Sequence, residues 1–151
     1  MQRSFAYQTA LKQLVFFALF VLYLSLSSIY PLLPPLFAIL FVLYMYALKK
    51  KEGFLFLLII SALLLYEAEK GYMLFSALIF FVLLERFVVP KLKQNFNCKS
   101  CITFIIVVIC YIGFYLYLML IANIFILPKP DISLYYAIYY IMIEFLLVSL
   151  L

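Results

Sequence analysis

The sequence predicts an all-α integral membrane protein with six transmembrane helices, short loops and both termini in the cytoplasm. Three observations indicate this class: the composition, the apolar runs and the distribution of basic residues. The chain has 151 residues, of which 71% are hydrophobic and 11% are charged, whereas an ordinary globular domain is about half apolar and a quarter charged. In water such a chain would expose a large apolar surface and aggregate. Lipid is therefore the expected solvent, and residues 1–151 are expected to form a single transmembrane domain.

Six apolar runs predict the helices, at approximately 14–30, 33–48, 52–68, 72–89, 101–127 and 132–151. A membrane-spanning helix needs about 17–25 residues. The first, fourth, fifth and sixth runs meet this requirement directly. The second run is short, and the third reaches the required length only if the charges at its ends extend toward water.

Turn-forming residues separate the runs. The first helix ends at the proline-rich residues 30–35, and the basic segment 49–53 separates the second helix from the third. Residues 67–71 (Glu-Ala-Glu-Lys-Gly) are expected to form a loop at the tip of the hairpin between helices three and four. The polar residues 90–100 and the Pro-Lys-Pro-Asp segment 128–131 give the last two breaks, because proline interrupts a helix.

Basic residues concentrate on one side of the predicted membrane. Alternate loops and termini carry nine on one side (Arg3, Lys12, Lys49, Lys50, Lys51, Arg86, Lys91, Lys93, Lys99) and two on the other (Lys70, Lys129). Since cytoplasmic loops are enriched in Lys and Arg, both termini are expected on the cytoplasmic side of a bacterial inner membrane. Topology thus explains the net charge of +5 without a nucleic acid partner. Ser25-Leu26-Ser27 resembles a signal-peptide cleavage site, but an uncleaved first helix is expected.

Glu144 is the clearest acidic residue inside a predicted helix, and such residues are functional candidates by default. Glu85 and Arg86 lie at a comparable depth near the inner end of helix four. An ion pair between Glu144 and Arg86 would lock helices four and six together. The alternative is a Glu144 without a charged partner, either protonated or extending to nearby water.

Two further features suggest contacts inside the membrane. Tyr135, Tyr136, Tyr139 and Tyr140 share one face of helix six, which suits either an isoprenoid or partner helix, or the aromatic belt at the membrane interface. Asn123, near the outer end of helix five, is expected to hydrogen-bond across helices.

The residues indicate no catalytic centre and no cofactor. His is absent, and no Ser–His, Cys–His or paired-carboxylate arrangement is legible. Cys98 and Cys101 form a C-x-x-C, but neither a second pair nor a His completes a zinc site, so reduced cytosolic thiols are expected. A non-enzymatic protein is therefore predicted.

The order of features resembles the bacterial rod shape-determining protein MreD family. The matching segments are Pro34-Pro35, Leu43–Leu48, the basic loop Lys49–Gly53, and Gly71 with Ser76-Ala77-Leu78. The family has a Leu-Gly before its fourth helix and an Asp about eight residues before the hairpin glycine. Counted from Gly71, that position is Leu63, an apolar residue, and Glu67 or Glu69 is a possible substitute.

The resemblance implies a scaffold of the cell-elongation complex, which makes peptidoglycan and sets cell shape. Its expected partners are membrane lipid, an MreC-like protein and the elongation transpeptidase and glycosyltransferase. The helical arrangement of the family is also similar to substrate-binding subunits of energy-coupling-factor transporters. A small-molecule-binding membrane subunit therefore remains the alternative function.

Overall fold

The computed structural model describes the backbone of residues 2–126 and 133–150, with the side chains of these residues except 2–7, 9 and 134. Every regular element in this part of the chain is helical. The elements are α1 (Gln2–Ile29), α2 (Phe37–Lys50), α3 (Gly53–Lys70), α4 (Ser76–Leu83), the π-helical turn η1 (Leu84–Val88), α5 (Val89–Asn95), α6 (Lys99–Phe125) and α7 (Leu134–Leu150).

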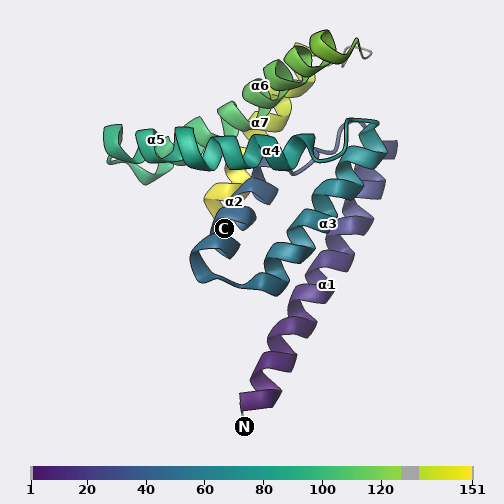
Figure 1. Ribbon diagram of the computed structural model, residues 1–151, viewed down its shortest axis with the longest axis vertical. Coiled ribbons are helices and arrows are strands. Elements are labelled where there is room, and N and C mark those ends of the chain that lie inside the picture. Colours follow the sequence, from purple (N-terminus) through teal and green to yellow (C-terminus); the bar gives the residue numbers. More distant parts are fainter. Residues whose placement is uncertain (1, 127–132, 151) are drawn as a thin grey trace.

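The all-helical prediction is confirmed, and each of the six predicted segments corresponds to one helical rod. The fourth rod consists of α4, η1 and α5, which follow one another without a break. In Figure 1 this rod crosses the view at a steep angle to α1 and α3, which run side by side. The predicted break at 128–131 lies outside the described residues.

Several predicted boundaries are wrong. α2 begins at Phe37 and α4 at Ser76, each four residues later than predicted, and the fourth rod continues to Asn95, into the polar segment predicted to break the chain. α1 begins at Gln2 instead of residue 14. α3 continues to Lys70, so Glu67 and Glu69 belong to the helix and not to a loop. Gly71 ends α3 with a φ of 68°, a left-handed conformation that glycine adopts without steric cost.

The π-helical turn in the fourth rod has a local cause in Pro90. Proline has no N–H, and its ring would collide with the carbonyl of Arg86 in a regular α-helix. The turn before it is widened, and the N–H of Val89 donates to the carbonyl of Leu84. The rod therefore continues past the proline without ending.

The core forms around α2, which packs against α3, α6 and α7. Phe37, in its first turn, is 1% exposed, and its ring centroid lies 5.6 Å from that of Tyr66, 4.9 Å from Phe81 and 4.5 Å from Phe114. These three rings come from α3, α4 and α6, so one side chain joins four helices. Gly113 provides space for this cluster, because a Cβ there would lie 3.2 Å from Cζ of Phe80.

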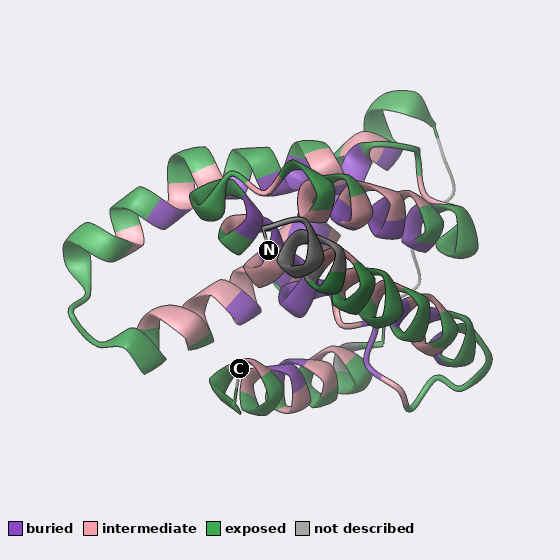
Figure 2. Cartoon of the chain, turned by 90° about the horizontal axis from the view of Figure 1, so that it is seen from below, coloured by how far each residue is buried: buried purple, intermediate pink, exposed green. Residues whose placement is uncertain are grey.

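Figure 2 shows the buried residues on the inward faces of the helices and exposed residues along their outer faces. Many outer residues are large and apolar, such as Leu19 and Leu22 on α1 and Leu116 and Leu120 on α6. Two segments, Ala10–Ile29 and Lys99–Phe125, are long and apolar enough to cross a membrane by length and composition. Their exposure to the surroundings fits contact with lipid better than a place in a protein core.

Candidate functional site

Glu144 of α7 is fully buried and binds the start of α2. The backbone N–H of Ala38 donates a 2.7 Å hydrogen bond to Oε2 of Glu144, and the hydroxyl of Tyr111 on α6 donates to Oε1. One carboxyl group thus connects α2, α6 and α7, although Ala38 and Glu144 are 106 residues apart in the chain.

The start of α2 requires this partner because its own sequence offers none. The first N–H groups of a helix have no acceptor within the helix. The residue before α2 is Leu36, which provides no side-chain cap and has a left-handed φ of 54°. A carboxylate brought from another helix satisfies the donors and is favoured by the positive end of the helix dipole.

Glu67 of α3 has the same function at the start of α4. Its carboxylate accepts hydrogen bonds from the N–H of Phe75 (2.6 Å), the N–H of Ala77 (2.5 Å) and the hydroxyl of Ser76 (3.2 Å). Glu67 is fully buried, and Phe75 has a left-handed φ of 68°. The polar side chain predicted to lie in a loop is therefore part of the interior.

The two helix starts are alike in detail. Each has a large apolar residue in the left-handed conformation, followed two residues later by a fully buried alanine whose N–H donates to a buried glutamate. In hydrocarbon or a protein interior, an unpaired N–H costs several kcal/mol in the least favourable case. The arrangement allows two helices to begin inside the apolar part of the molecule.

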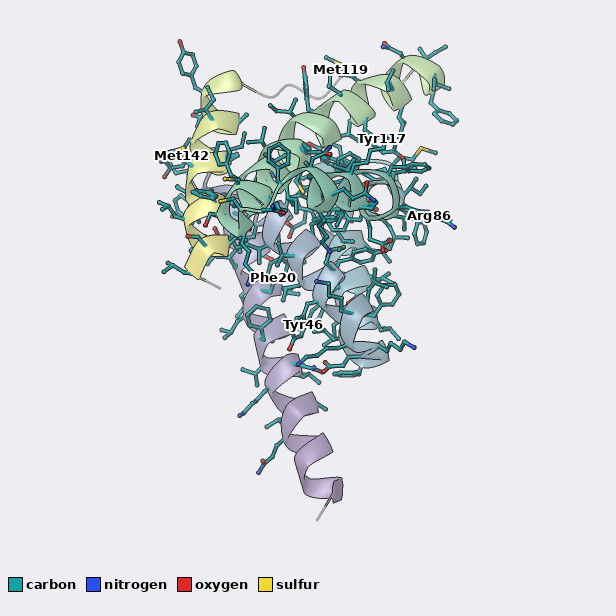
Figure 3. The ribbon with its side chains drawn as sticks, turned by 90° about the vertical axis from the view of Figure 1, so that its left-hand side faces the viewer. Phe20, Tyr46, Arg86, Tyr117, Met119 and Met142 are labelled. Carbon is teal, nitrogen blue, oxygen red and sulfur yellow. The ribbon has the colours of Figure 1, made fainter. Side chains whose placement is uncertain are left out.

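The proposed ion pair between Glu144 and Arg86 is wrong. Both carboxyl oxygens of Glu144 are already hydrogen-bonded, and its charge is countered by the helix start. Figure 3 shows Arg86 at the opposite edge of the molecule from Met142, which lies on α7 close to Glu144. Arg86 is exposed and Glu85 is half-buried, both on η1.

Asn123 does not lie between helices in the described part of the chain. It is exposed near the end of α6, so the predicted hydrogen bond across helices has no support there. The predicted tyrosine face is divided. Tyr136 and Tyr140 line a cleft, whereas Tyr135 and Tyr139, which are 87% and 41% exposed, are not among its lining residues.

The cleft has a volume of about 540 Å³ and lies above the start of α2. Residues of α1, α2, α3, α6 and α7 line it, and six are tyrosines: Tyr66, Tyr72, Tyr111, Tyr115, Tyr136 and Tyr140. Its floor contains Phe37, which also forms the centre of the aromatic core. The hydroxyl of Tyr111 connects the cleft wall directly to Glu144.

Two tyrosine hydroxyls hold the proline-rich segment between α1 and α2, which forms one wall. Tyr23 donates a 2.9 Å hydrogen bond to the carbonyl of Pro34, and Tyr140 donates to the carbonyl of Pro31. Both Pro31 and Pro35 line the cleft. The segment is thus fixed from both sides, by α1 and by α7.

Two residues of this site were not predicted as such: Glu67 was expected in a loop and was named only as a possible substitute for the family's Asp, and Tyr111 was not singled out. Glu67 is buried and Glu69 is exposed, because residues two apart on a helix point in different directions. The usable signal was the eight-residue spacing from Glu67 to Phe75, directly before a new helix. Tyr111 had no signal, because nothing in its local pattern distinguishes it from the other tyrosines.

Cys98 and Cys101 are free and exposed, and Cys110 is free and buried. Within the described residues, no three His, Cys, Asp or Glu side chains come close enough together to hold a metal ion.

The site defines a helical protein in which two buried glutamates hold the starts of two helices beneath a tyrosine-lined cleft. Comparison of the chain with models of known families, with curated proteins and with solved structures gave no match.

Proposed function

We propose that this protein is a non-enzymatic scaffold of the cell-elongation complex in the bacterial inner membrane, similar to the MreD family. The supporting observation is the Glu67–Phe75 contact. In that family an Asp lies about eight residues before a glycine. This glycine belongs to a Leu-Gly pair that precedes the fourth helix. Leu74-Phe75 directly precedes α4, and Glu67 lies eight residues before Phe75. Phe75 is not a glycine, but it has the left-handed φ that glycine favours, and this count differs from the one made from Gly71, which gives Leu63.

The proposal includes six membrane spans with both termini in the cytoplasm. Its support is the excess of Lys and Arg at one set of loops, together with the two segments that are long enough to cross. A membrane-impermeant maleimide tests the orientation. In intact spheroplasts of a Cys98→Ser, Cys101→Ser background, a Lys70→Cys variant is expected to react and a Lys49→Cys variant to react only after lysis. The reverse pattern overturns the topology.

The partner surfaces are the apolar outer faces of α1 and α6, which the chain leaves exposed. A single-pass helix of an MreC-like protein or of the transpeptidase can pack along such a face by van der Waals contact. Leu22 and Leu120, each 62% exposed, mark the two faces.

Co-purification tests the scaffold role. Detergent extracts of the native host are expected to contain an MreC-like protein or a cell-wall transpeptidase bound to this chain, and depletion is expected to turn rods into spheres. Photo-crosslinking residues at positions 22 and 120 are expected to capture these partners, with position 49 as the control. Normal cell shape after depletion, with neither partner recovered, would refute the proposal.

A further inference from the structure

The tyrosine-lined cleft has the size of a ligand-binding site and is independent of the scaffold role. Its volume of about 540 Å³ falls within the range of about 300–1,000 Å³ that is typical of small-molecule sites. Such sites are mostly apolar or aromatic, with a few polar groups in fixed positions. The cleft has this composition.

The charge that lines the cleft, among the described residues, is positive. Lys70, the last residue of α3, is the only charged side chain among the described residues that line it, and no carboxylate or amide side chain is among them. Apart from the thiol of Cys110, the remaining polar side chains of the lining are hydroxyls, from Ser27, Ser28 and Ser133 and from the six tyrosines. Among these hydroxyls, those of Tyr111, Tyr140 and Ser28 already donate within the protein. The others can donate to an anionic oxygen, and the ammonium of Lys70 adds a positive charge at the rim.

The walls are held in place before any ligand binds. Tyr111 is fixed by Glu144, and Tyr140 is fixed by the carbonyl of Pro31. Tyr66 packs on Phe37 with centroids 5.6 Å apart, and on Tyr72 with centroids 6.2 Å apart. A ligand therefore enters a site whose side chains are already ordered, which lowers the entropy cost of binding.

We propose that this cleft binds an amphipathic anion. An aromatic or other apolar body lies between the tyrosine rings of α3, α6 and α7, and a single carboxylate or phosphate lies beside Lys70. Two sources have this chemistry: a soluble aromatic acid from the aqueous side, and an anionic lipid from the bilayer.

Thermal unfolding of the purified full chain in phosphatidylcholine nanodiscs tests the proposal, because a ligand that binds the folded state raises the midpoint. For the soluble source, 2-naphthoate is compared with neutral 2-naphthol. For the lipid source, discs with added phosphatidylglycerol are compared with discs of phosphatidylcholine alone. At least one anion is expected to stabilise the protein more than its neutral counterpart does.

Two variants assign the effect to the cleft. Lys70→Gln is expected to weaken the effective anion about threefold, as for the loss of one exposed ion pair, while the control Lys49→Gln leaves binding unchanged. Ala137→Trp fills the cleft from α7 and is expected to abolish binding, while Ile138→Trp, on the adjacent exposed position, preserves it.

The results distinguish a soluble acid from a lipid as the ligand, and they identify the outcomes that refute the proposal. A response to 2-naphthoate alone assigns a soluble acid, and a response to phosphatidylglycerol alone assigns a lipid. Equal effects of the anions and their neutral counterparts overturn the proposal, as does undiminished binding by Ala137→Trp. If Ala137→Trp does not fold, the difference between Lys70→Gln and Lys49→Gln decides, and equal binding by these two refutes an anion site at Lys70.

Discussion

Replacing Glu144 with leucine tests whether a buried carboxylate stabilises the start of α2. The substitution leaves two buried donors without an acceptor, the N–H of Ala38 and the hydroxyl of Tyr111. Each unsatisfied group costs about 1–3 kcal/mol, so Glu144→Leu is expected to lower the free energy of unfolding by about 2–6 kcal/mol. Glu144→Gln keeps one of the two acceptor oxygens and loses the charge, so it is expected to cost less than Glu144→Leu but to remain destabilising.

Reversible unfolding in mixed micelles measures these differences. Glu69→Leu is the matched control, because Glu69 is exposed on α3 and its loss is expected to change stability by no more than about 0.5 kcal/mol. A double-mutant cycle between Glu144→Gln and Tyr111→Phe isolates the energy of their contact. The reasoning is refuted if Glu144→Leu costs no more than Glu69→Leu.

Three further predictions follow from the backbone, the packing and the thiols. Phe75→Gly is expected to fold as well as the native chain, because glycine removes the strain of a φ of 68°, whereas Phe75→Val is expected to lower the unfolding midpoint in the same micelles. Gly113→Val is expected to cost about 1–3 kcal/mol by crowding Phe80, and the loss should shrink in combination with Phe80→Leu. A hydrogen bond from the Cys101 thiol lowers the pKa of the Cys98 thiol below its ordinary value. Alkylation of Cys98 by iodoacetamide, followed by mass spectrometry, is therefore expected to begin at lower pH in the native chain than in Cys101→Ala, which removes the donor.

Six helical segments could be read from the sequence because composition and turn residues determine them. Proline at 31, 34 and 35 and the basic residues at 49–51 interrupt apolar runs wherever the rest of the chain lies. The boundary at Glu67 was misplaced for a related reason. A charged residue near a glycine is typical of a loop, and only the position of α4 shows that this carboxylate faces inward.

The partner of Glu144 could not be read from the sequence, for a different reason. Charge alone favours Arg86, the nearest basic residue in predicted depth. The structure instead gives the carboxylate a backbone N–H and a phenol hydroxyl. Backbone groups are present at every position, so a pattern of side chains gives no sign of which helix start will bind an acid. The cleft likewise depends on how five separate helices meet.

The two glutamates also differ in when their contacts can form during synthesis. Glu67 and Ala77 are ten residues apart, so the corner between α3 and α4 can close as soon as both have left the ribosome. Ala38 must wait for Glu144, which is made 106 residues later. Until α7 has been made, the N–H of Ala38 needs water or another acceptor, so the start of α2 reaches its final structure only after α7 is in place.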